Sequence, residues 1–518
     1  MSELLTAAQM RAIEQAAIHS GTVTGLELME RAGRGVVEAI FEAWPEVADQ
    51  PGRAVVLCGP GNNGGDGYVI ARLLKALGWI VDIFQFGDAA NLPADAKENH
   101  NLWQAEGGVR PWHVPDIAKA SGDLLVDAVF GAGLTRAAPA EVLAPLVTVF
   151  EHDRFAGRVV AVDAPTGLCM DSGTALSAEH GAALADLTVT FHQARPGHFL
   201  NDGPRHCGRV VVKSIGLEGY DVPGTVQYAD EQICWALGKS ADRHKYGYGH
   251  ALVLSGGAGR TGAARLAARG ALRVGAGLVT LGVPPAAQME VACQITAVML
   301  NRIDSAGALA KVLTDSRFNA LCLGPGMGTE RARELVPVAL AASAPGDGAH
   351  RAVVLDADAI TAYEAAPETL FDMLHAQCVL TPHLGEFSRL FPDIAGKIGS
   401  VTGGGPAYSK VDAARDAARR AGCTVLLKGA DTVIADQSGA CAINAAVYDR
   451  AAPWLATAGS GDVLAGFVTG MLARGEAPLR AAEIAAWLHV ECARRFGPGL
   501  IAEDLPEMLP GVLKSLRA

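Results

Sequence analysis

The chain alternates between short apolar runs and segments with apolar positions at helical spacing. Residues 5–44 follow the helical spacing and end near Trp44 and Pro45. Apolar runs between helical segments then predict strands at 53–59, 80–86, 124–131, 159–167, 187–198 and 209–216. Near-continuous apolar strands separated by helices are typical of a parallel sheet with helices on both faces.

A second series of the same kind begins at residue 250. It comprises the run HALVLSGGAGRTG (250–262), an alanine-rich helix (263–276) and apolar runs near 278–285, 320–328, 351–360, 378–387 and 424–436. Between the two series, residues 217–242 lose the strand–helix pattern and predict a connection. We therefore predict an α/β protein with two doubly wound domains, at 1–217 and 241–518, joined by a linker at 218–240.

Composition agrees with two large α/β domains and excludes several classes of partner. The chain has 518 residues, 50% of them apolar, which is enough for two buried cores. Its formal net charge is −12 and its 43 Lys and Arg residues form no basic arm, so neither nucleic acid nor an anionic membrane is an expected partner. No uncharged apolar run reaches the length of about 18 residues that a membrane span needs.

The cysteines and the first residues predict a cytoplasmic protein. The ten cysteines include no C-x-x-C pair and several lie inside apolar runs, so we expect reduced core residues rather than disulfides or a zinc site. The first residues include Glu3 and lack the apolar stretch of a signal peptide. Large alanine-rich helices permit self-assembly, and we expect a homo-oligomer.

Two glycine patterns match those of nucleotide-binding turns. Gly59–Gly64 and Gly257–Gly262 both match G-x-G-x-x-G after a predicted strand and before a predicted helix. Each match alone is a weak signal, because a tight strand–helix turn without a ligand has the same pattern. The second match also lacks an acid at the end of the following strand.

Acidic and amide side chains follow three predicted strands of the first series. Asn62, Asn63 and Asp66 follow the first strand in GPGNNGGDG, and Asp127 and Asp163 lie near the ends of two others. The carboxyl ends of parallel strands meet at one edge of a sheet, where ligands bind. We therefore predict a binding site at this edge. The alternative is that Asp66 only caps a helix and Asp163 only caps a loop.

The most specific motif of the second series is AGSGD at 458–462. A glycine-rich helix start presents N–H groups to phosphate oxygens, and Asp462 can accept a proton from a hydroxyl that attacks phosphorus. Lys428, at a strand end, suggests a further contact to phosphate or nucleotide. His383 beside Glu386 could be catalytic, orient a ligand or form a plain loop pair, and Asp462 could be an ordinary helix cap.

These motifs together resemble two known families. In the first series, LMERAG, GPGNNGGDG, VDAVFGAGL, VDAPTGL and HQARPGH resemble the NAD(P)H-hydrate epimerase domain, which is Rossmann-like. In the second, HKYGYGHALVLSGG, ALRVGAGLVT, GPGMG, VVLDADA, LTPHLGEF, LLKGADTVI and ATAGSGDVLAG resemble the ribokinase-like NAD(P)H-hydrate dehydratase domain. Their order and spacing span nearly the whole chain, which therefore resembles the fused bifunctional NAD(P)H-hydrate repair family.

The resemblance implies roles for individual residues. In the epimerase half, the hydrated nucleotide would contact Asn62, Asn63, Gly64, Gly65, Asp66, Gly131, Ala132, Gly133, Leu134, Thr135, Arg136, Ala137 and Asp163. A potassium ion would bind Asn63, Asp127 and Thr166. In the dehydratase half, the substrate would contact Ala263, Gly328, His383 and Asp462, and the adenine nucleotide would contact Lys428, Gly429, Ala430, Asp431, Thr432 and Gly461.

Three positions depart from the family pattern. Thr166 stands where serine is more common, which keeps a hydroxyl at the implied ion site. Arg195 stands where lysine is more common, so a lysine acid is absent there. Tyr246 replaces a glycine in HKYGYGH, which puts the family's backbone path in doubt for that loop.

The resemblance also implies a two-step chemistry on NADHX and NADPHX, in which water has added across a nicotinamide double bond. Hydroxide is a poor leaving group, so transfer of phosphate from ADP or ATP, with magnesium, would let the oxygen leave as phosphate. The epimerase half would only break and remake the C–O bond, with Asp163 as acid–base. The family uses ADP in bacteria and ATP in eukaryotes, and the fused arrangement favours ADP.

Two other functions fit parts of the sequence. An ordinary ribokinase-type kinase, acting on a vitamin precursor, would explain AGSGD equally and would release a stable phosphorylated product. The N-terminal half could instead be a nucleotide-sensing or docking module without activity. The three acids Asp66, Asp127 and Asp163 at one predicted edge argue against a purely sensing role.

Overall fold

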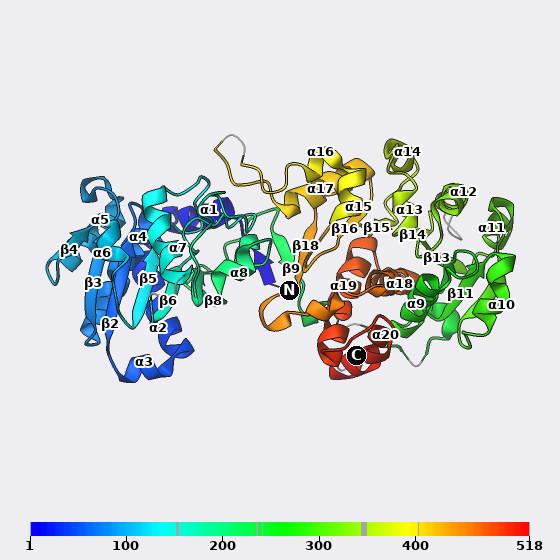
Figure 1. The fold of residues 1–518 in the computed structure, drawn as a ribbon, viewed down its shortest axis with the longest axis horizontal. Coiled ribbons are helices and arrows are strands. Elements are labelled where there is room, and N and C mark those ends of the chain that lie inside the picture. The colour runs from blue at the N-terminus through cyan, green and yellow to red at the C-terminus, as the bar shows by residue number, and fades with distance from the viewer. Residues whose placement is uncertain are drawn as a thin grey trace. The chain divides into compact units, whose positions relative to one another are not determined.

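The structure is a computed structural model that describes residues 2–151, 155–234, 237–240, 242–342, 350–401 and 404–516. The chain divides into two compact units. The N-terminal unit comprises Glu3–Val226 with Gly399–Ser409, and the C-terminal unit comprises Met1–Ser2, Gln227–Ile398 and Lys410–Ala518. Figure 1 shows the first unit mainly in blue and cyan and the second in green to red.

Seven strands form the sheet of the N-terminal unit, and all their pairings are parallel. Their order is β4-β3-β2-β5-β6-β7-β8. The strands are β2 (Arg53–Cys58), β3 (Ile80–Gln85), β4 (Val109–Pro111), β5 (Leu124–Ala128), β6 (Arg158–Val162), β7 (Leu187–Phe191) and β8 (Arg209–Lys213). The order reverses between β2 and β5, which is where ligands bind in doubly wound sheets.

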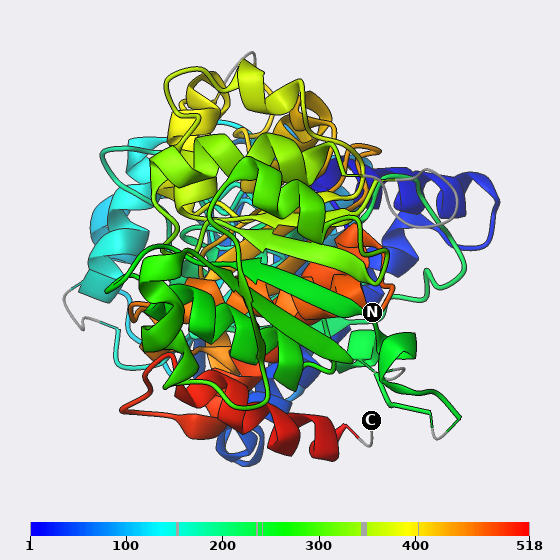
Figure 2. The same ribbon diagram turned by 90° about the vertical axis from the view of Figure 1, so that its right-hand side faces the viewer.

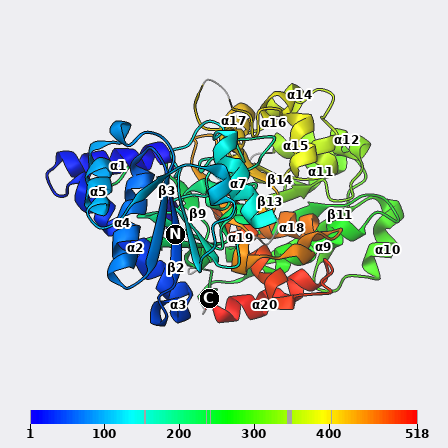
Figure 3. The same cartoon turned by 60° about the vertical axis from the view of Figure 1, so that its left-hand side comes forward.

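Helices cover both faces of this sheet because β2 and its neighbours are apolar on both sides. Ala54 and Val56 pack in one cluster with α1 (Ala7–His19), α2 (Gly25–Ala43), α4 (Asn62–Ala76) and α5 (Ala94–Gln104). Val55 and Leu57 pack in another cluster with α6 (Val114–Ile117) and α7 (Ala140–Glu151). Figure 3 shows α2 and α4 beside each other next to β2. Two further helices of this unit are α3 (Pro45–Asp49) and α8 (Gly203–Cys207).

The predicted helical segment 5–44 is two helices rather than one. Thr6 and Thr24 each begin a helix with a capping box, in which the threonine and the residue three positions later bond each other's backbone N–H. Between the helices, Gly21 has φ of 74°, a conformation that α-helical backbone does not adopt. Apolar spacing alone did not reveal this break.

Eleven strands form the second sheet, in the order β1-β9-β18-β17-β16-β15-β14-β13-β10-β11-β12. They are β1 (Ser2–Leu4), β9 (Val226–Tyr228), β10 (His250–Leu254), β11 (Leu278–Val283), β12 (Met299–Arg302), β13 (Phe318–Leu323), β14 (Ala352–Leu355), β15 (Cys378–Leu380), β16 (Thr424–Leu427), β17 (Asp431–Ala435) and β18 (Cys441–Ala445). Figure 2 shows strands of this sheet with helices on both faces.

The second sheet is mixed, which corrects the expectation of purely parallel strands. The predicted run 424–436 is a hairpin, because the chain turns at Lys428–Ala430 and β17 pairs antiparallel with β16 and β18. Strand β9 lies inside the segment predicted as a pure connection. The predicted class, α/β with two doubly wound units, is confirmed.

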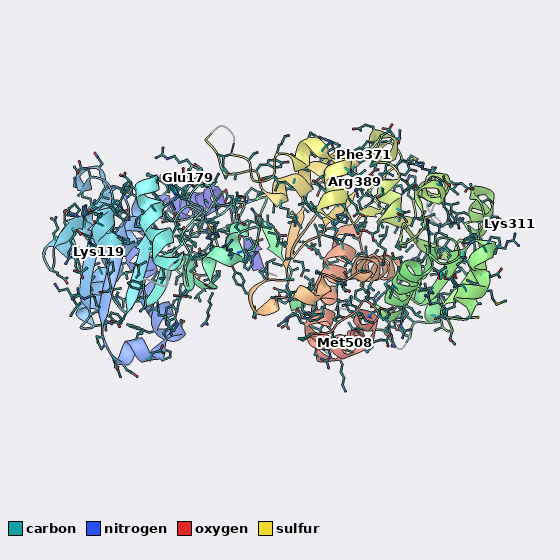
Figure 4. All side chains as sticks on the ribbon, in the orientation of Figure 1. Lys119, Glu179, Lys311, Phe371, Arg389 and Met508 are labelled. Atoms are coloured by element: carbon teal, nitrogen blue, oxygen red, sulfur yellow. The ribbon has the colours of Figure 1, made fainter. Side chains whose placement is uncertain are left out.

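Close helix packing shapes the C-terminal unit. Its helices are α9 (Gly262–Arg273), α10 (Gln288–Ala292), α11 (Ala306–Val312), α12 (Thr329–Leu340), α13 (Asp358–Thr361), α14 (Glu368–Phe371), α15 (Leu384–Leu390), α16 (Pro392–Ala395), α17 (Lys410–Ala421), α18 (Ser460–Ala473), α19 (Pro478–Phe496) and α20 (Asp504–Ser515). Phe371, labelled in Figure 4, stacks on Phe391 with ring centroids 5.0 Å apart. A Cβ on Gly466 would lie 2.1 Å from the carbonyl oxygen of Ala267, so α18 and α9 touch through their backbones.

The cysteines and the helices agree with two further predictions. All ten cysteines are free, and every one except Cys293 is buried, which confirms the prediction of reduced core residues. In the described part of the chain, no helix combines the length and apolarity needed to span a membrane. Charged side chains such as Lys119, Glu179 and Lys311, labelled in Figure 4, are exposed.

Candidate functional site

A cavity of about 540 Å³ lies at the carboxyl ends of β2 and β5–β7 in the N-terminal unit. Helix α1 contributes Arg11 and Glu14 to its lining, and α4 contributes Asp66. Helix α2 contributes apolar residues, and the turn after β5 and the loops after β6 and β7 supply much of the remainder, including Asp163 and Arg195. The cavity therefore lies at the reversal of strand order, as expected for a doubly wound sheet.

Asp163 is held in place by three donors. Its carboxylate accepts hydrogen bonds from Thr190 Oγ1 and from the backbone N–H of Ala132, both at 2.9 Å. The guanidinium of buried Arg195 lies 3.6 Å from the same carboxylate. Asp163 also has φ of 63°, a left-handed conformation that non-glycine residues adopt at a cost. The surrounding structure thus aims this carboxylate at the cavity.

His198 supports the backbone behind Asp163. Burial, together with Arg195, lowers the pKa of His198 to about 4, so the ring is neutral at neutral pH. Its Nδ1 accepts from the backbone N–H of Arg195 at 2.9 Å, which leaves the proton on Nε2, 3.4 Å from the carbonyl oxygen of Asp163. This histidine therefore connects the two loops that present Asp163 and Arg195.

Asn63 connects the glycine-rich loop to the turn after β5. Its amide is oriented so that Nδ2 donates to the carbonyl of Val162 at 3.1 Å and Oδ1 accepts from the N–H of Gly131 at 3.2 Å. A Cβ on Gly131 would lie 2.8 Å from the Asn63 side chain and 3.1 Å from Asp163. Glycine is required at residue 131 because the three loops approach one another so closely.

Asp127 and Thr166 lie together in the interior, outside the cavity lining. The Asp127 carboxylate accepts from the Thr166 backbone N–H at 2.8 Å and from Thr166 Oγ1 at 2.7 Å. Burial raises the pKa of Asp127 to about 6, although the hydrogen bonds of Thr166 oppose the shift. This buried carboxyl group has no basic side chain within ion-pair distance among the described residues.

Asp66 does not cap α4. The helix begins at Asn62, its N-cap is Gly61 without a side-chain hydrogen bond, and Asp66 lies past the first turn. Burial, with Asp163 and Glu14 nearby, raises the pKa of Asp66 well above its usual value. The capping alternative for Asp66 is therefore wrong, and the carboxyl faces the cavity.

Most of the residues predicted for the epimerase site line this cavity. Those that do are Asn62, Asn63, Asp66, Gly131, Ala132, Gly133, Leu134, Thr135, Arg136 and Asp163. Gly64, Gly65 and Ala137 lie outside the lining. Gly64 and Gly65 instead permit close packing, since Cβ atoms there would lie 2.1 Å from the carbonyl oxygen of Gly59 and 2.5 Å from the sulfur of Met29.

The second candidate site is built around a buried lysine at the end of β16. Lys428 Nζ donates to Asp356 Oδ1 at 2.8 Å and lies 3.9 Å from Glu386. Thr381 Oγ1 donates to the same Asp356 oxygen at 2.9 Å. Burial alone would lower the pKa of Lys428, but Asp356, Glu386 and Asp462 together raise it. The lysine is therefore charged and faces three carboxyl groups.

Asp462 is the carboxyl group of this cluster with a pKa near neutrality. Burial and the nearby Asp356 raise its pKa to about 7, while Lys428 opposes the shift. The N-cap of α18 is Gly459, with φ of 89° and no side-chain hydrogen bond, so Asp462 is not the cap. A Cβ on Gly461 would lie 3.4 Å from Lys428 Nζ, which places the AGSGD turn against the lysine.

A cavity of about 470 Å³ adjoins this turn. Five of the six predicted nucleotide contacts line it, namely Lys428, Gly429, Ala430, Thr432 and Gly461. Asp431 does not line the cavity and forms an ion pair with Lys410 at 2.6 Å. His489, a residue that the sequence analysis did not identify, also lines the cavity and donates from Nε2 to the carbonyl of Ser460 at 2.9 Å.

The remaining predicted dehydratase residues lie on neighbouring turns. Gly328 donates its backbone N–H to Asp358 at 2.8 Å, and a Cβ on Gly326 would lie 3.3 Å from Ala263. His383 is exposed and caps α15, where its Nδ1 accepts from the N–H groups of Gly385 and Glu386. One alternative predicted for His383 was a plain structural role in its loop, and the histidine does have such a role. Its ring is also accessible to solvent.

The described residues do not include a cluster of three or more His, Cys, Asp and Glu side chains suited to a metal ion. Any cation in the N-terminal unit would therefore need amide, hydroxyl or backbone oxygens beside a carboxylate. Asn63, Asp127 and Thr166 supply that kind of set, and hard oxygen ligands suit an alkali cation. An uncompensated buried carboxylate also favours a neighbouring cation.

Family models match both units. A model described as NAD(P)H-hydrate dehydratase matches residues 251–509. A model described as YjeF-related protein N-terminus matches residues 25–197. The first match contains the cavity and the carboxyl cluster of its unit. The second contains those of the N-terminal unit apart from α1 and Ile215, which lie outside residues 25–197.

Similar proteins cover either the whole chain or one unit. The bifunctional NAD(P)H-hydrate repair enzyme Nnr of Moorella thermoacetica is 34% identical, over 99% of this chain and 97% of the relative. The NAD(P)H-hydrate epimerase of Rhodobacter capsulatus is 48% identical, over 42% of this chain and 100% of the relative. The crystal structure of an ADP/ATP-dependent NAD(P)H-hydrate dehydratase from Bacillus subtilis, with ATP/Mg²⁺, shows 28% identity and a TM-score of 0.45, covering 56% of this chain and 99% of that chain.

Proposed function

Because the chain belongs to the family of bifunctional NAD(P)H-hydrate repair enzymes, we propose that each unit performs one step of the repair. The N-terminal unit interconverts the R and S forms of NADHX and NADPHX. The C-terminal unit dehydrates the S form to NADH or NADPH at the expense of ADP or ATP. The observation that supports this best is that each unit has its own cavity with an aspartate at it, Asp163 in the N-terminal unit and Asp462 beside the lining residue Gly461 in the C-terminal unit.

The C-terminal cluster supports phosphoryl transfer to the hydroxyl of the hydrate. Asp462, with a pKa of about 7, is a base that can accept the proton of the attacking hydroxyl. The adjacent N-terminus of α18 and the charged Lys428 favour phosphate oxygens. Once the oxygen bears phosphate, the ring nitrogen's lone pair expels it and the C=C bond is restored by loss of a proton.

Nucleotide hydrolysis explains why a dehydratase has a kinase-like site. Water as solvent opposes loss of water, and hydroxide is a poor leaving group, whereas phosphate leaves readily. The cavity beside Lys428, Gly429 and Gly461 is the proposed place of the ADP, bound with magnesium. His489 is then a positioning residue, because its hydrogen bond to the carbonyl of Ser460 holds the turn that contains Gly461.

The N-terminal cluster supports cleavage and re-formation of the C–O bond of a carbinolamine. Loss of the hydroxyl leaves a positive charge shared between the carbon and the ring nitrogen. The Asp163 carboxylate, fixed by Thr190 and Ala132, is suited to stabilise that charge and to exchange a proton with water. The guanidinium of Arg195 lies 3.6 Å from this carboxylate and helps to hold it in place.

Asn63, Asp127 and Thr166 would hold a potassium ion in the N-terminal unit. The set offers an amide, a carboxylate and a hydroxyl, and Asp127 is buried without a basic neighbour within ion-pair distance among the described residues. A bound potassium ion would supply positive charge that can attract anionic groups of the substrate. The cytoplasmic location and the homo-oligomeric state of the chain stay predictions.

An assay with hydrated NADH tests this proposal directly. Purified protein is incubated with a mixture of both epimers and either ADP or ATP with Mg²⁺, and NADH is followed by its absorbance. We expect NADH to appear only with nucleotide, together with equimolar AMP and phosphate when ADP is the donor. Accumulation of a stable phosphorylated product without NADH would instead support the vitamin-precursor kinase.

A further inference from the structure

The cavity of the N-terminal unit contains a second carboxyl group that no step above uses. Glu14 lies on α1, one turn after Arg11, and lines the same cavity as Asp163 and Arg195. Helix α1 is remote in sequence from the loops after β6 and β7, so only the packing of the fold brings these groups together. The N-terminal family match begins at residue 25 and does not include Glu14.

Glu14 and Asp163 have different surroundings. Asp163 accepts two hydrogen bonds and faces Arg195, and these contacts fix the position of its carboxylate. Glu14 forms no hydrogen bond and no ion pair within the described residues, although it is largely removed from solvent. Its carboxyl group is therefore free to turn toward a molecule bound in the cavity.

Several charged groups face Glu14 from different elements. Burial and the nearby Asp163 together raise the pKa of Glu14 to about 7, while Arg195 and Arg11 oppose the shift. Asp66 on α4 faces the same group, and Asp95 and Arg136 complete the charged lining of the cavity. Near neutral pH both protonation states of Glu14 are populated, which is the property that acid–base catalysis requires.

We propose that Glu14 is the acid–base partner of Asp163 in epimerisation, an inference that rests on the function proposed above. Protonated Glu14 gives its proton to the hydroxyl on the carbon beside the ring nitrogen. The C–O bond breaks, water leaves, and the nitrogen's lone pair forms a C=N bond. A water molecule then adds to the opposite face of that carbon and its proton passes to Asp163. Proton exchange with solvent resets both groups, and the reverse reaction exchanges their roles.

Asp66 is the competing candidate in the same cavity. Burial, with Asp163 and Glu14 nearby, raises the pKa of Asp66 well above its usual value. A shift in this direction suits Asp66 to donating a hydrogen bond to the substrate better than to releasing a proton in each turnover. Substitution of the two residues therefore separates the two roles.

The test follows epimerisation alone, in the full chain without nucleotide, so that no dehydration occurs. The reaction starts from one epimer of NADHX, and the rate at which the two epimers equilibrate is measured across the neutral pH range. The proteins compared are wild type, Glu14→Gln, Glu14→Asp, Asp66→Asn and the exposed-site control Gln15→Ala. We expect Glu14→Gln to slow epimerisation by about 10²–10⁴-fold, with the spontaneous rate as the lower limit. Gln15→Ala stays at the wild-type rate and Glu14→Asp retains part of it.

The pH profile distinguishes proton transfer from a structural role. The wild-type rate should fall as pH rises through about 7, because Glu14 then loses the proton it donates. Glu14→Gln should lack this dependence, whereas Asp66→Asn should keep it. A wild-type rate for Glu14→Gln, or a wild-type rate that does not change around pH 7, would overturn the proposal. Absence of epimerisation by wild type itself would instead contradict the proposed function.

Discussion

At the scale of the residue, both sites use the same arrangement of charges. In each site, a carboxyl group with a pKa of about 7 lies near a second acid that is paired with a basic side chain. The first group is Glu14 in the N-terminal unit and Asp462 in the C-terminal unit. The paired acids are Asp163 with Arg195 and Asp356 with Lys428. Burial is the largest cause of each raised pKa, and the neighbouring aspartate is the next. Two unrelated cavities thus obtain a proton-transfer group suited to neutral pH.

Asp462→Asn keeps the size of the side chain but removes the proton acceptor. We expect dehydration of the S epimer to slow by about 10²–10⁴-fold while ADP still binds. The wild-type kcat/KM should fall as pH drops through about 7, because burial and Asp356 raise the pKa of Asp462 to that value and only the ionised form accepts a proton. Steady-state kinetics and calorimetry of ADP binding measure the two effects separately.

The control for this change is Asp304→Asn, which alters an exposed aspartate paired with Arg302 in the same unit. It should leave turnover and its pH dependence unchanged. Near-normal turnover in Asp462→Asn would mean that the carboxylate only contributes charge to the first turn of α18.

The sequence predicted three of the acids at the two sites because each of the three lies in a local motif. Asp66, Asp163 and Asp462 follow glycine-rich or strand-end patterns that point to the carboxyl end of a strand. Glu14 and His489 were missed, since they lie on helices whose apolar spacing gives no sign of which polar side chain faces a cavity. The capping of α15 by His383 is visible only in the structure.

At the scale of the element, the strands and helices agree with the apolar patterns except where a turn lies inside an apolar run. The hairpin of β16 and β17 lies within one predicted apolar run, because Lys428–Ala430 are only three residues between two β-branched, apolar segments. The turn is fixed by a contact that the sequence does not reveal, in which Thr432 Oγ1 donates to the carbonyl of Gly429 at 2.8 Å.

The contact of α9 with α18 depends on glycines in α18. A Cβ at Gly466 would lie 2.1 Å from the carbonyl oxygen of Ala267. Because this oxygen belongs to the backbone, it cannot move aside as a flexible side chain can. We expect Gly466→Ala to destabilise the C-terminal unit by about 1–3 kcal/mol and to lower its thermal unfolding midpoint, as measured by calorimetry.

Gly307→Ala is the matched control for the change in α18. Gly307 lies in α11, and a Cβ there would meet nothing within 4 Å. Alanine loses less conformational freedom than glycine on folding, so this change should stabilise the unit by about 0.5–1 kcal/mol. Equal effects of the two substitutions would contradict the close backbone contact between α9 and α18.

At the scale of the whole molecule, the two units perform consecutive steps on one substrate. Hydration of the nicotinamide ring creates a stereocentre, so both epimers form, and a shaped dehydratase cavity accepts one of them. A chain with both activities converts the whole mixture, because the N-terminal unit keeps replenishing the epimer that the C-terminal unit consumes. The spontaneous opening of the carbinolamine provides a slow background for the same interconversion.

Asp163→Ala should expose this division of labour. Given both epimers and ADP, wild type should convert all of the hydrate in one phase. The variant should convert the S epimer at the normal rate and the rest only at the spontaneous epimerisation rate, because the Asp462 cluster is unchanged. Adding full-length Asp462→Asn protein, which keeps its epimerase site, should remove the slow phase. A single fast phase in Asp163→Ala would mean that Asp163 is dispensable or that the dehydratase accepts both epimers.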